Sequence, residues 1–102
     1  MNHGSAMDAT VQALVAALAR YLCEHPAASD SAQGMRHWWL ERSTEATEMQ
    51  LQAALEWMMA QALIERVVAA DGRVRYSRRA DVAQLAAVQQ LLDTVAARQP
   101  KH

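Results

Sequence analysis

The feature that most constrains the fold is a change of hydrophobic period past the middle of the chain. Up to about residue 62 the apolar residues recur at helical spacing, whereas residues 63–69 (LIERVVA) and 73–78 (RVRYSR) are short runs rich in Val, Ile and Tyr. Asp71 and Gly72 lie between these runs, and an Asp-Gly pair tolerates the positive φ that a tight hairpin requires. The sequence therefore predicts one β-hairpin in an otherwise helical chain.

Four helices are predicted around this hairpin, at about residues 8–24, 32–41, 48–62 and 82–98. Each of them has a residue at its start whose side chain can cap a helix: Asp8, Asp30 or Ser31, Thr47, and Asp81. Gln50 follows Thr47 by three residues, which predicts a capping box. The apolar residues that face inward in this arrangement should form one core: Leu14, Leu18, Leu22, Leu51, Leu55, Met58 and Leu63.

The 102 residues are enough for a single domain with a modest core. We interpret residues 1–7 as a disordered leader, 8–81 as the folded domain, 82–98 as a helix that packs on the first helix, and 99–102 as a tail. Cys23 is the only cysteine, so no intrachain disulfide forms and a cytoplasmic setting is predicted. The apolar runs fall short of the ~20 residues of a membrane-spanning helix, so no membrane association is expected.

The stretch TEMQLQAALEWMMAQALIER, followed by DGRVRY, resembles the third helix and the wing of small bacterial winged helix-turn-helix DNA-binding proteins. The residues that match the family pattern are Leu51, Ala54, Leu55, Met58, Leu63, Ile64 and Arg66. Ala62 departs from it, because the family usually has a helix-ending glycine there. The resemblance covers about residues 31–79, and it implies a mainly helical winged-helix fold, a non-enzymatic transcriptional regulator, and dimerisation through flanking helices.

A regulator of this kind binds double-stranded DNA through the start of its third helix. Gln50 and Gln52 are the candidates for reading adenine edges in the major groove. The same surface carries no Lys or Arg, and the carboxylates of Glu45, Glu48 and Glu56 would repel phosphates. The third helix alone is therefore a poor source of DNA affinity.

The hairpin offers the missing positive charge. Five of the ten basic residues lie on it or just after it, and they are Arg66, Arg73, Arg75, Arg78 and Arg79. Arg73, Arg75, Arg78 and Arg79 are candidates for phosphate contacts, with Arg73 and Arg75 on one face of the strand. Alternatively, these charges lie on the solvent-exposed edge of a small sheet and prevent another chain from pairing with it. The sequence leaves both interpretations open.

The second functional hypothesis is a protein-interaction adaptor that does not bind DNA specifically. Trp38 and Trp39 are adjacent, and either one can share the inner face of a helix with Met35, which leaves the other near the surface. Trp39, Met49 and Trp57 are the interface candidates for a protein partner. The alternative is that tryptophan fills gaps at the boundary of a core that has no Phe.

The last predicted helix carries an apolar stripe with heptad-like spacing, formed by Leu85, Val88, Leu92 and Val95. The stripe is too short for a coiled coil of its own, so it must pack on something. Part of it can cover the first helix, and the remainder can pair with a second copy of the chain. We therefore predict a homodimer in which Leu85, Leu92 and Val95 are partly exposed in a single protomer.

Little in the sequence indicates catalysis. Cys23, His25 and His37 form an incomplete set of metal ligands without a fourth member or the usual paired spacing. Glu45 and Glu48 are adequately explained as carboxylates at a helix start. There is no Gly-rich phosphate loop and no nucleophile motif, so the sequence predicts neither an enzyme nor a bound metal or cofactor.

Overall fold

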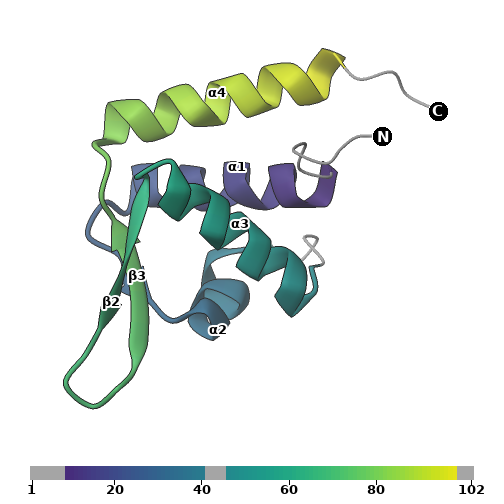
Figure 1. The fold of residues 1–102 in the computed structure, drawn as a ribbon. Coiled ribbons are helices and arrows are strands. Elements are labelled where there is room, and N and C mark those ends of the chain that lie inside the picture. The colour runs from purple at the N-terminus through teal and green to yellow at the C-terminus, as the bar shows by residue number, and fades with distance from the viewer. Residues whose placement is uncertain (1–8, 41–45, 99–102) are drawn as a thin grey trace.

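The computed structural model describes residues 9–40 and 46–98, with side chains up to residue 94. The described residues are mainly helical and include a small antiparallel sheet (Figure 1). The helices are α1 (Ala9–Glu24), α2 (Ala32–Gly34), the π-helix η1 (Met35–Trp39), α3 (Glu48–Ala60) and α4 (Val82–Arg98). The strands are β1 (Ser29–Asp30), β2 (Ile64–Val68) and β3 (Val74–Arg78). The expected leader at 1–7, the cap at Asp8, residues 41–45 and the tail at 99–102 lie outside the described residues.

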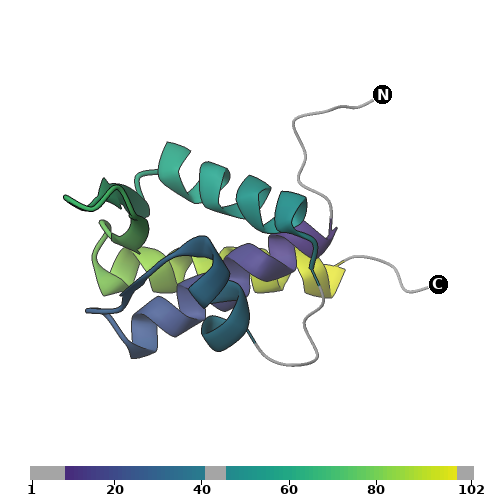
Figure 2. The ribbon, with the colours of Figure 1, turned by 90° about the horizontal axis from the view of Figure 1, so that it is seen from below.

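Helix α1 is the central element, since it contacts α4, α3 and η1. Figure 1 shows α1 and α4 lying side by side and the hairpin extending from one end of the molecule, while Figure 2 shows the same arrangement from below. The side chains that meet between these helices form one buried cluster. That cluster includes all seven predicted core residues, which are confirmed: Leu14, Leu18, Leu22, Leu51, Leu55, Met58 and Leu63.

The predicted hairpin is confirmed. Strands β2 and β3 pair antiparallel, with Val68 opposite Val74 next to the turn. The turn is closed by the N–H of Ala69, which donates to the carbonyl of Arg73 at 2.8 Å. Gly72 adopts a φ of +84°, the left-handed conformation that a three-residue hairpin loop requires at this position. Glycine is therefore needed at the turn for its backbone freedom.

Strand β1 was not predicted. It pairs with the other edge of β3, where Ser29 lies opposite Ser77, and gives the sheet order β1-β3-β2. Two residues are too short to show an alternating pattern in the sequence, so only the pairing with a distant strand identifies β1. The small sheet therefore ties the segment after α1 to the hairpin.

The second helix differs from the expected single α-helix. Ser31 caps α2 as predicted, accepting a hydrogen bond from the N–H of Gly34 at 3.1 Å, but after Gly34 the backbone widens into the π-helix η1. A π-helix closes i→i+5 hydrogen bonds and so has more residues per turn than an α-helix. Relative to Met35, this turns position i+4 inward and position i+3 away, which places Trp39 in the core and Trp38 outside.

Candidate functional site

The two adjacent tryptophans have opposite environments. The side chain of Trp38 is 72% exposed, whereas that of Trp39 is 7% exposed and packs in the core. This settles which indole is buried, and it removes Trp39 from the candidates for a protein interface because its ring offers no surface to a partner. The exposed ring of the pair belongs to Trp38, which was not among the interface candidates.

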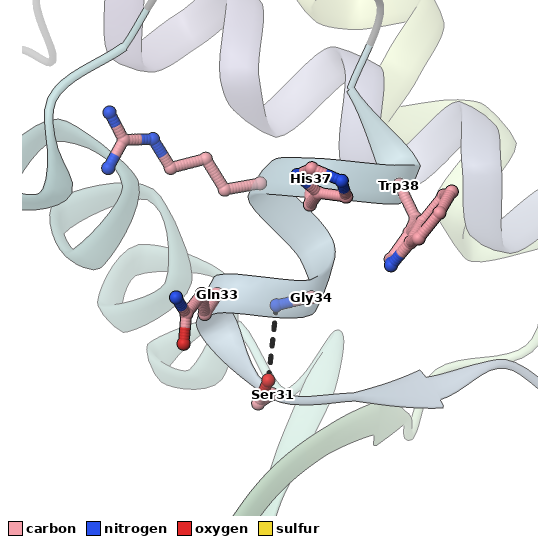
Figure 3. A pocket seen from close by; sticks show the side chains of 6 residues that line it. Ser31, Gln33, Gly34, His37 and Trp38 are labelled. Carbon is pink, nitrogen blue, oxygen red and sulfur yellow. Dashed lines mark hydrogen bonds between the residues drawn. The ribbon is translucent and has the colours of Figure 1, made fainter.

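Trp38 borders an open hollow of about 600 Å³. We call its lining the Trp38 face, and the residues are Ser31, Gln33, Gly34, Arg36, His37 and Trp38. Figure 3 shows the rings of His37 and Trp38 projecting from η1 and the Ser31 hydroxyl accepting a hydrogen bond from the N–H of Gly34. The two rings meet edge to face, with centroids 4.7 Å apart and an angle of 80° between their planes. The imidazole thus supports the exposed indole from one side.

The fixed charge in the described lining of the Trp38 face is that of Arg36. Among the described residues, this lining contains the guanidinium of Arg36 and the imidazole of His37 but no carboxylate, and the carboxylate of Asp30 lies beside Gly34. Within residues 9–40 and 46–94, the guanidinium of Arg36 has no ion-pair or hydrogen-bond partner. Among the described residues, no contact has to be broken before this charge pairs with a ligand.

A second hollow of about 350 Å³ lies between α2 and η1 on one side and α3 on the other. Its lining consists of Ala32, Gln33, Arg36, Glu48, Leu51 and Gln52. Gln33 and Arg36 border both hollows, so the two hollows form one continuous surface from Trp38 to the first turns of α3. The carboxylate of Glu48 makes the far end of this surface acidic.

The two glutamines proposed to read DNA differ in their freedom. The predicted capping box is present: the Oε1 of Gln50 accepts from the N–H of Thr47 at 2.9 Å, and the N–H of Gln50 donates to the Thr47 hydroxyl at 3.1 Å. A bidentate contact with adenine needs both the oxygen and the nitrogen of the amide, so Gln50 would have to open this cap. Gln52 is exposed, and so are the carboxylates of Glu48 and Glu56.

Of the other residues on α3, Met49 is 83% exposed and Trp57 is half-buried. Both therefore have side-chain surface exposed to solvent, and their role in an interface stays a prediction. The carboxylate of Glu45, which was also placed at the start of this helix, lies outside the described residues.

The hairpin arginines are divided between solvent and internal contacts. Arg73 is exposed, and its Nε lies 3.4 Å from a carboxylate oxygen of Asp71. Arg75 is exposed, with Nη1 donating to the carbonyl of Ser29 at 3.3 Å. Arg66 and Arg79 are also exposed. These four retain accessible positive charge on the hairpin and just after it.

Arg78 has a different environment. It is half-buried, its Nε donates to the carbonyl of Pro26 at 3.1 Å, and its Nη1 donates to the carbonyl of Ala80 at 2.7 Å. These bonds connect the segment after α1 to the segment before α4. Arg78 therefore has a structural role that a phosphate contact would compete with.

The prediction that Leu85 and Leu92 are partly exposed in a single protomer is wrong. Their exposed fractions are 0% and 8%, because α4 packs along α1 and covers them. Val88 is half-buried, and the side chain of Val95 lies outside the described residues. Leu91, on the outer side of α4, stays exposed. A homodimer remains a prediction, and α4 offers less apolar surface for it than the spacing indicated.

The candidate metal ligands are not assembled. In the part of the chain that the structure describes, no group of three or more His, Cys, Asp or Glu side chains could hold a metal ion. The thiol of Cys23 lies 3.7 Å from the carbonyl oxygen of Val82, and the ring of His25 packs against Tyr21 with centroids 4.4 Å apart. Burial, and secondarily the carboxylate of Glu24, raise the pKa of the Cys23 thiol.

Among the described helices, none has the length and apolar character needed to cross a membrane.

No family model, no curated protein and no solved structure matches this chain.

Proposed function

We propose that the chain is a winged-helix domain that acts as a protein-interaction adaptor and docks its partner on the Trp38 face. The observation that carries the proposal is the 72% exposure of Trp38 beside a buried Trp39. Exposed Trp and Arg side chains around a hollow are the residue types that dominate binding energy at protein interfaces. π-Helical turns are rare and occur frequently at functional sites, which further favours this segment.

The winged-helix part of the proposal is supported by the order of the elements. Helix α1, the contiguous helices α2 and η1, and helix α3 precede the hairpin β2–β3, and α4 follows it. Ala62 adopts a φ of +58°, so the position where the winged-helix pattern usually has a glycine uses the conformation that glycine favours. This agreement supports the alignment of α3 and the hairpin with the family pattern.

The electrostatics of α3 favour a protein partner over DNA. Residues 48–60 contain no Lys or Arg, and Glu48 and Glu56 are exposed. Affinity for DNA depends mainly on neutralising phosphates, and a helix inserted in the major groove with two exposed carboxylates opposes it. Gln50 is also held in the capping box.

The proposal is tested by cross-linking and affinity capture from cell extract with three forms of the protein: unchanged, Trp38→Ala, and Val68→Ala. Val68 is an exposed apolar residue on the hairpin and serves as the matched control. We expect a protein that is captured by the unchanged chain and by Val68→Ala but lost with Trp38→Ala. Capture of the same proteins by all three forms would contradict docking through Trp38.

A DNA-binding transcriptional regulator is the second candidate, and the hairpin favours it. Residues 64–79 contain five arginines and two carboxylates, so this segment carries +3 in a chain whose net charge is −1. If these arginines bind DNA, each phosphate contact adds about −0.9 to the slope of log affinity against log salt. Replacing Arg73 and Arg75 with Ala should then weaken binding to all sequences and flatten the slope, whereas Gln52→Ala should relax base preference alone.

The salt series separates the two candidates. Fluorescence anisotropy with a pool of genomic DNA fragments at ~50 mM salt gives non-specific binding its best chance. Binding that disappears in the Arg73→Ala, Arg75→Ala variant and persists in Trp38→Ala would favour the regulator. The absence of binding under these conditions would eliminate it.

A further inference from the structure

We propose that the Trp38 face binds an acidic segment of a protein partner, in which a carboxylate pairs with Arg36 and an apolar side chain packs on the Trp38 indole. This inference rests on the proposed docking function and specifies the chemistry of what docks. It assigns separate roles to Arg36, for charge, and to Trp38, for apolar contact.

Charge complementarity is the first argument. Among the described residues, the lining of the Trp38 face contains a cationic guanidinium and an imidazole but no carboxylate, and Arg36 has no partner there. The carboxylate of Asp30 lies beside Gly34, where it accepts a hydrogen bond from the N–H of Ser31. A planar guanidinium suits a carboxylate because it can donate two parallel hydrogen bonds. A basic partner segment would instead place like charges against Arg36.

The indole of Trp38 is suited to an apolar contact. Its exposed ring surface is largely apolar, and the edge-to-face contact with His37 limits its motion. An aromatic ring that is already held in position loses little conformational entropy when a partner covers it. An apolar side chain of the same partner segment would therefore gain contact area on Trp38 at a small entropic penalty.

Single-stranded nucleic acid is the competing occupant, since it is also anionic and stacks on exposed aromatic rings. The second hollow argues against it. Arg36 borders both hollows, and Glu48 borders the one next to α3, so a ligand that extends from Trp38 along α3 passes a positive and then a negative side chain. A nucleic acid strand carries a negative charge on every nucleotide and would meet Glu48 with repulsion. A protein segment can place a neutral or basic residue there.

The test uses the full chain labelled with fluorotryptophan, so that the indole of Trp38 is observed separately from those of Trp39 and Trp57 by fluorine NMR. The Trp38→Ala variant assigns the signal. Three probes are titrated: a short synthetic peptide of glutamate, leucine and serine, its counterpart with lysine in place of each glutamate, and oligothymidylate. We expect the glutamate peptide to shift the Trp38 signal and leave that of the buried Trp39 in place.

The expected preference for the glutamate peptide over the lysine peptide is about tenfold or more in Kd. Arg36→Glu should reverse this preference. Arg75→Glu makes the same change in net charge on the hairpin and should leave the preference unchanged. Equal or tighter binding of the lysine peptide to the unchanged chain would overturn the inference, as would failure of the glutamate peptide to bind.

Tighter binding of oligothymidylate through Trp38 would also overturn it and would point to nucleic acid. These outcomes are distinguishable from failure of the docking function itself. A lysine peptide that shifts the Trp38 signal would refute the acidic partner and retain docking on Trp38. The docking function itself fails if, in the capture experiment, the Trp38→Ala variant still captures every protein that the unchanged chain captures.

Discussion

The indole ring of Trp39 stacks on the phenol ring of Tyr21, with centroids 4.6 Å apart and planes inclined by 13°. Tyr21 lies near the end of α1, so this stack fixes η1 against the central helix of the domain. Stacked aromatic pairs contribute about 0.5–1.5 kcal/mol beyond the burial of their area. The burial of Trp39 and the exposure of Trp38 are thus two consequences of one local geometry.

The two tryptophans should respond oppositely to truncation. Trp39→Ala removes a buried ring and its stack on Tyr21, so we expect the free energy of unfolding to fall by about 3–5 kcal/mol. Trp38→Ala removes an exposed ring and should change it by no more than about 0.5 kcal/mol. Urea unfolding followed by circular dichroism measures both, and similar losses in the two variants would contradict the assignment of the rings.

Ala62 should be a site where glycine stabilises the fold. It ends α3 at a φ of +58°, and hydrogen bonds run from the N–H of Leu63 to the carbonyl of Met58 at 2.9 Å and from the N–H of Ala62 to the carbonyl of Met59 at 3.0 Å. This is the Schellman arrangement, in which the left-handed residue is usually glycine. Because a side chain at positive φ costs roughly 1 kcal/mol or more, Ala62→Gly should raise the free energy of unfolding by about 1 kcal/mol.

The control is Ala60→Gly, at an exposed position in the last turn of α3. There the backbone is helical, and glycine should lower stability by about 0.5–1 kcal/mol. Thermal unfolding of the two variants gives the comparison. A loss of stability in both would show that the end of α3 gains nothing from glycine.

A side chain at Gly34 should displace the carboxylate of Asp30. A Cβ at this position would collide with that carboxylate, whose Oδ1 accepts a hydrogen bond from the N–H of Ser31 at 2.8 Å. The carboxylate would have to rotate away and lose this bond, so Gly34→Ala is expected to destabilise the domain by about 0.5–1.5 kcal/mol. Combining it with Asp30→Ala should recover part of that loss, since the two residues are in contact. Strictly additive losses in the double variant would rule out the collision as the cause.

The reactivity of Cys23 should depend on folding. Because its pKa is raised, the folded state favours the neutral thiol, and less thiolate is present at mildly alkaline pH than in a free cysteine. Alkylation by iodoacetamide should be slower in the native protein than in urea, where the rate should approach that of a model thiol. The same shift stabilises the fold below the ordinary pKa of a thiol, and this contribution is lost as the pH rises through the raised pKa. Equal alkylation rates in both states would contradict the shift.

The parts of the fold that could be predicted from the sequence are those with local signals. The Thr47–Gln50 capping box and the Gly72 turn each depend on residues a few positions apart, and both were found where expected. The inward-facing leucines were identifiable because their spacing matches a helix over several turns. Local chemistry was sufficient in each of these cases.

The features of the fold that the sequence does not predict depend on contacts between distant segments or on very short elements. Strand β1 has two residues and is defined by its pairing with β3. The π-turn of η1 spans five residues, which are too few for the spacing of apolar residues to distinguish it from an α-helix. The sequence therefore does not show which of Trp38 and Trp39 is exposed. Leu85 and Leu92 were assigned partly to a second copy, because their spacing does not show how much of the stripe α1 covers.

The packing of α4 along α1 also has a consequence for the order of folding. These helices lie at opposite ends of the sequence, so their contact has a large sequence separation and closes the longest loop in the fold. Contacts of this kind slow folding because the loop entropy is lost before the contact forms. During synthesis, the side of α1 that α4 covers lacks this cover until α4 leaves the ribosome. The nascent chain therefore exposes an apolar helix face while the segment between α1 and α4 is made, and that face is a site where a chaperone can bind.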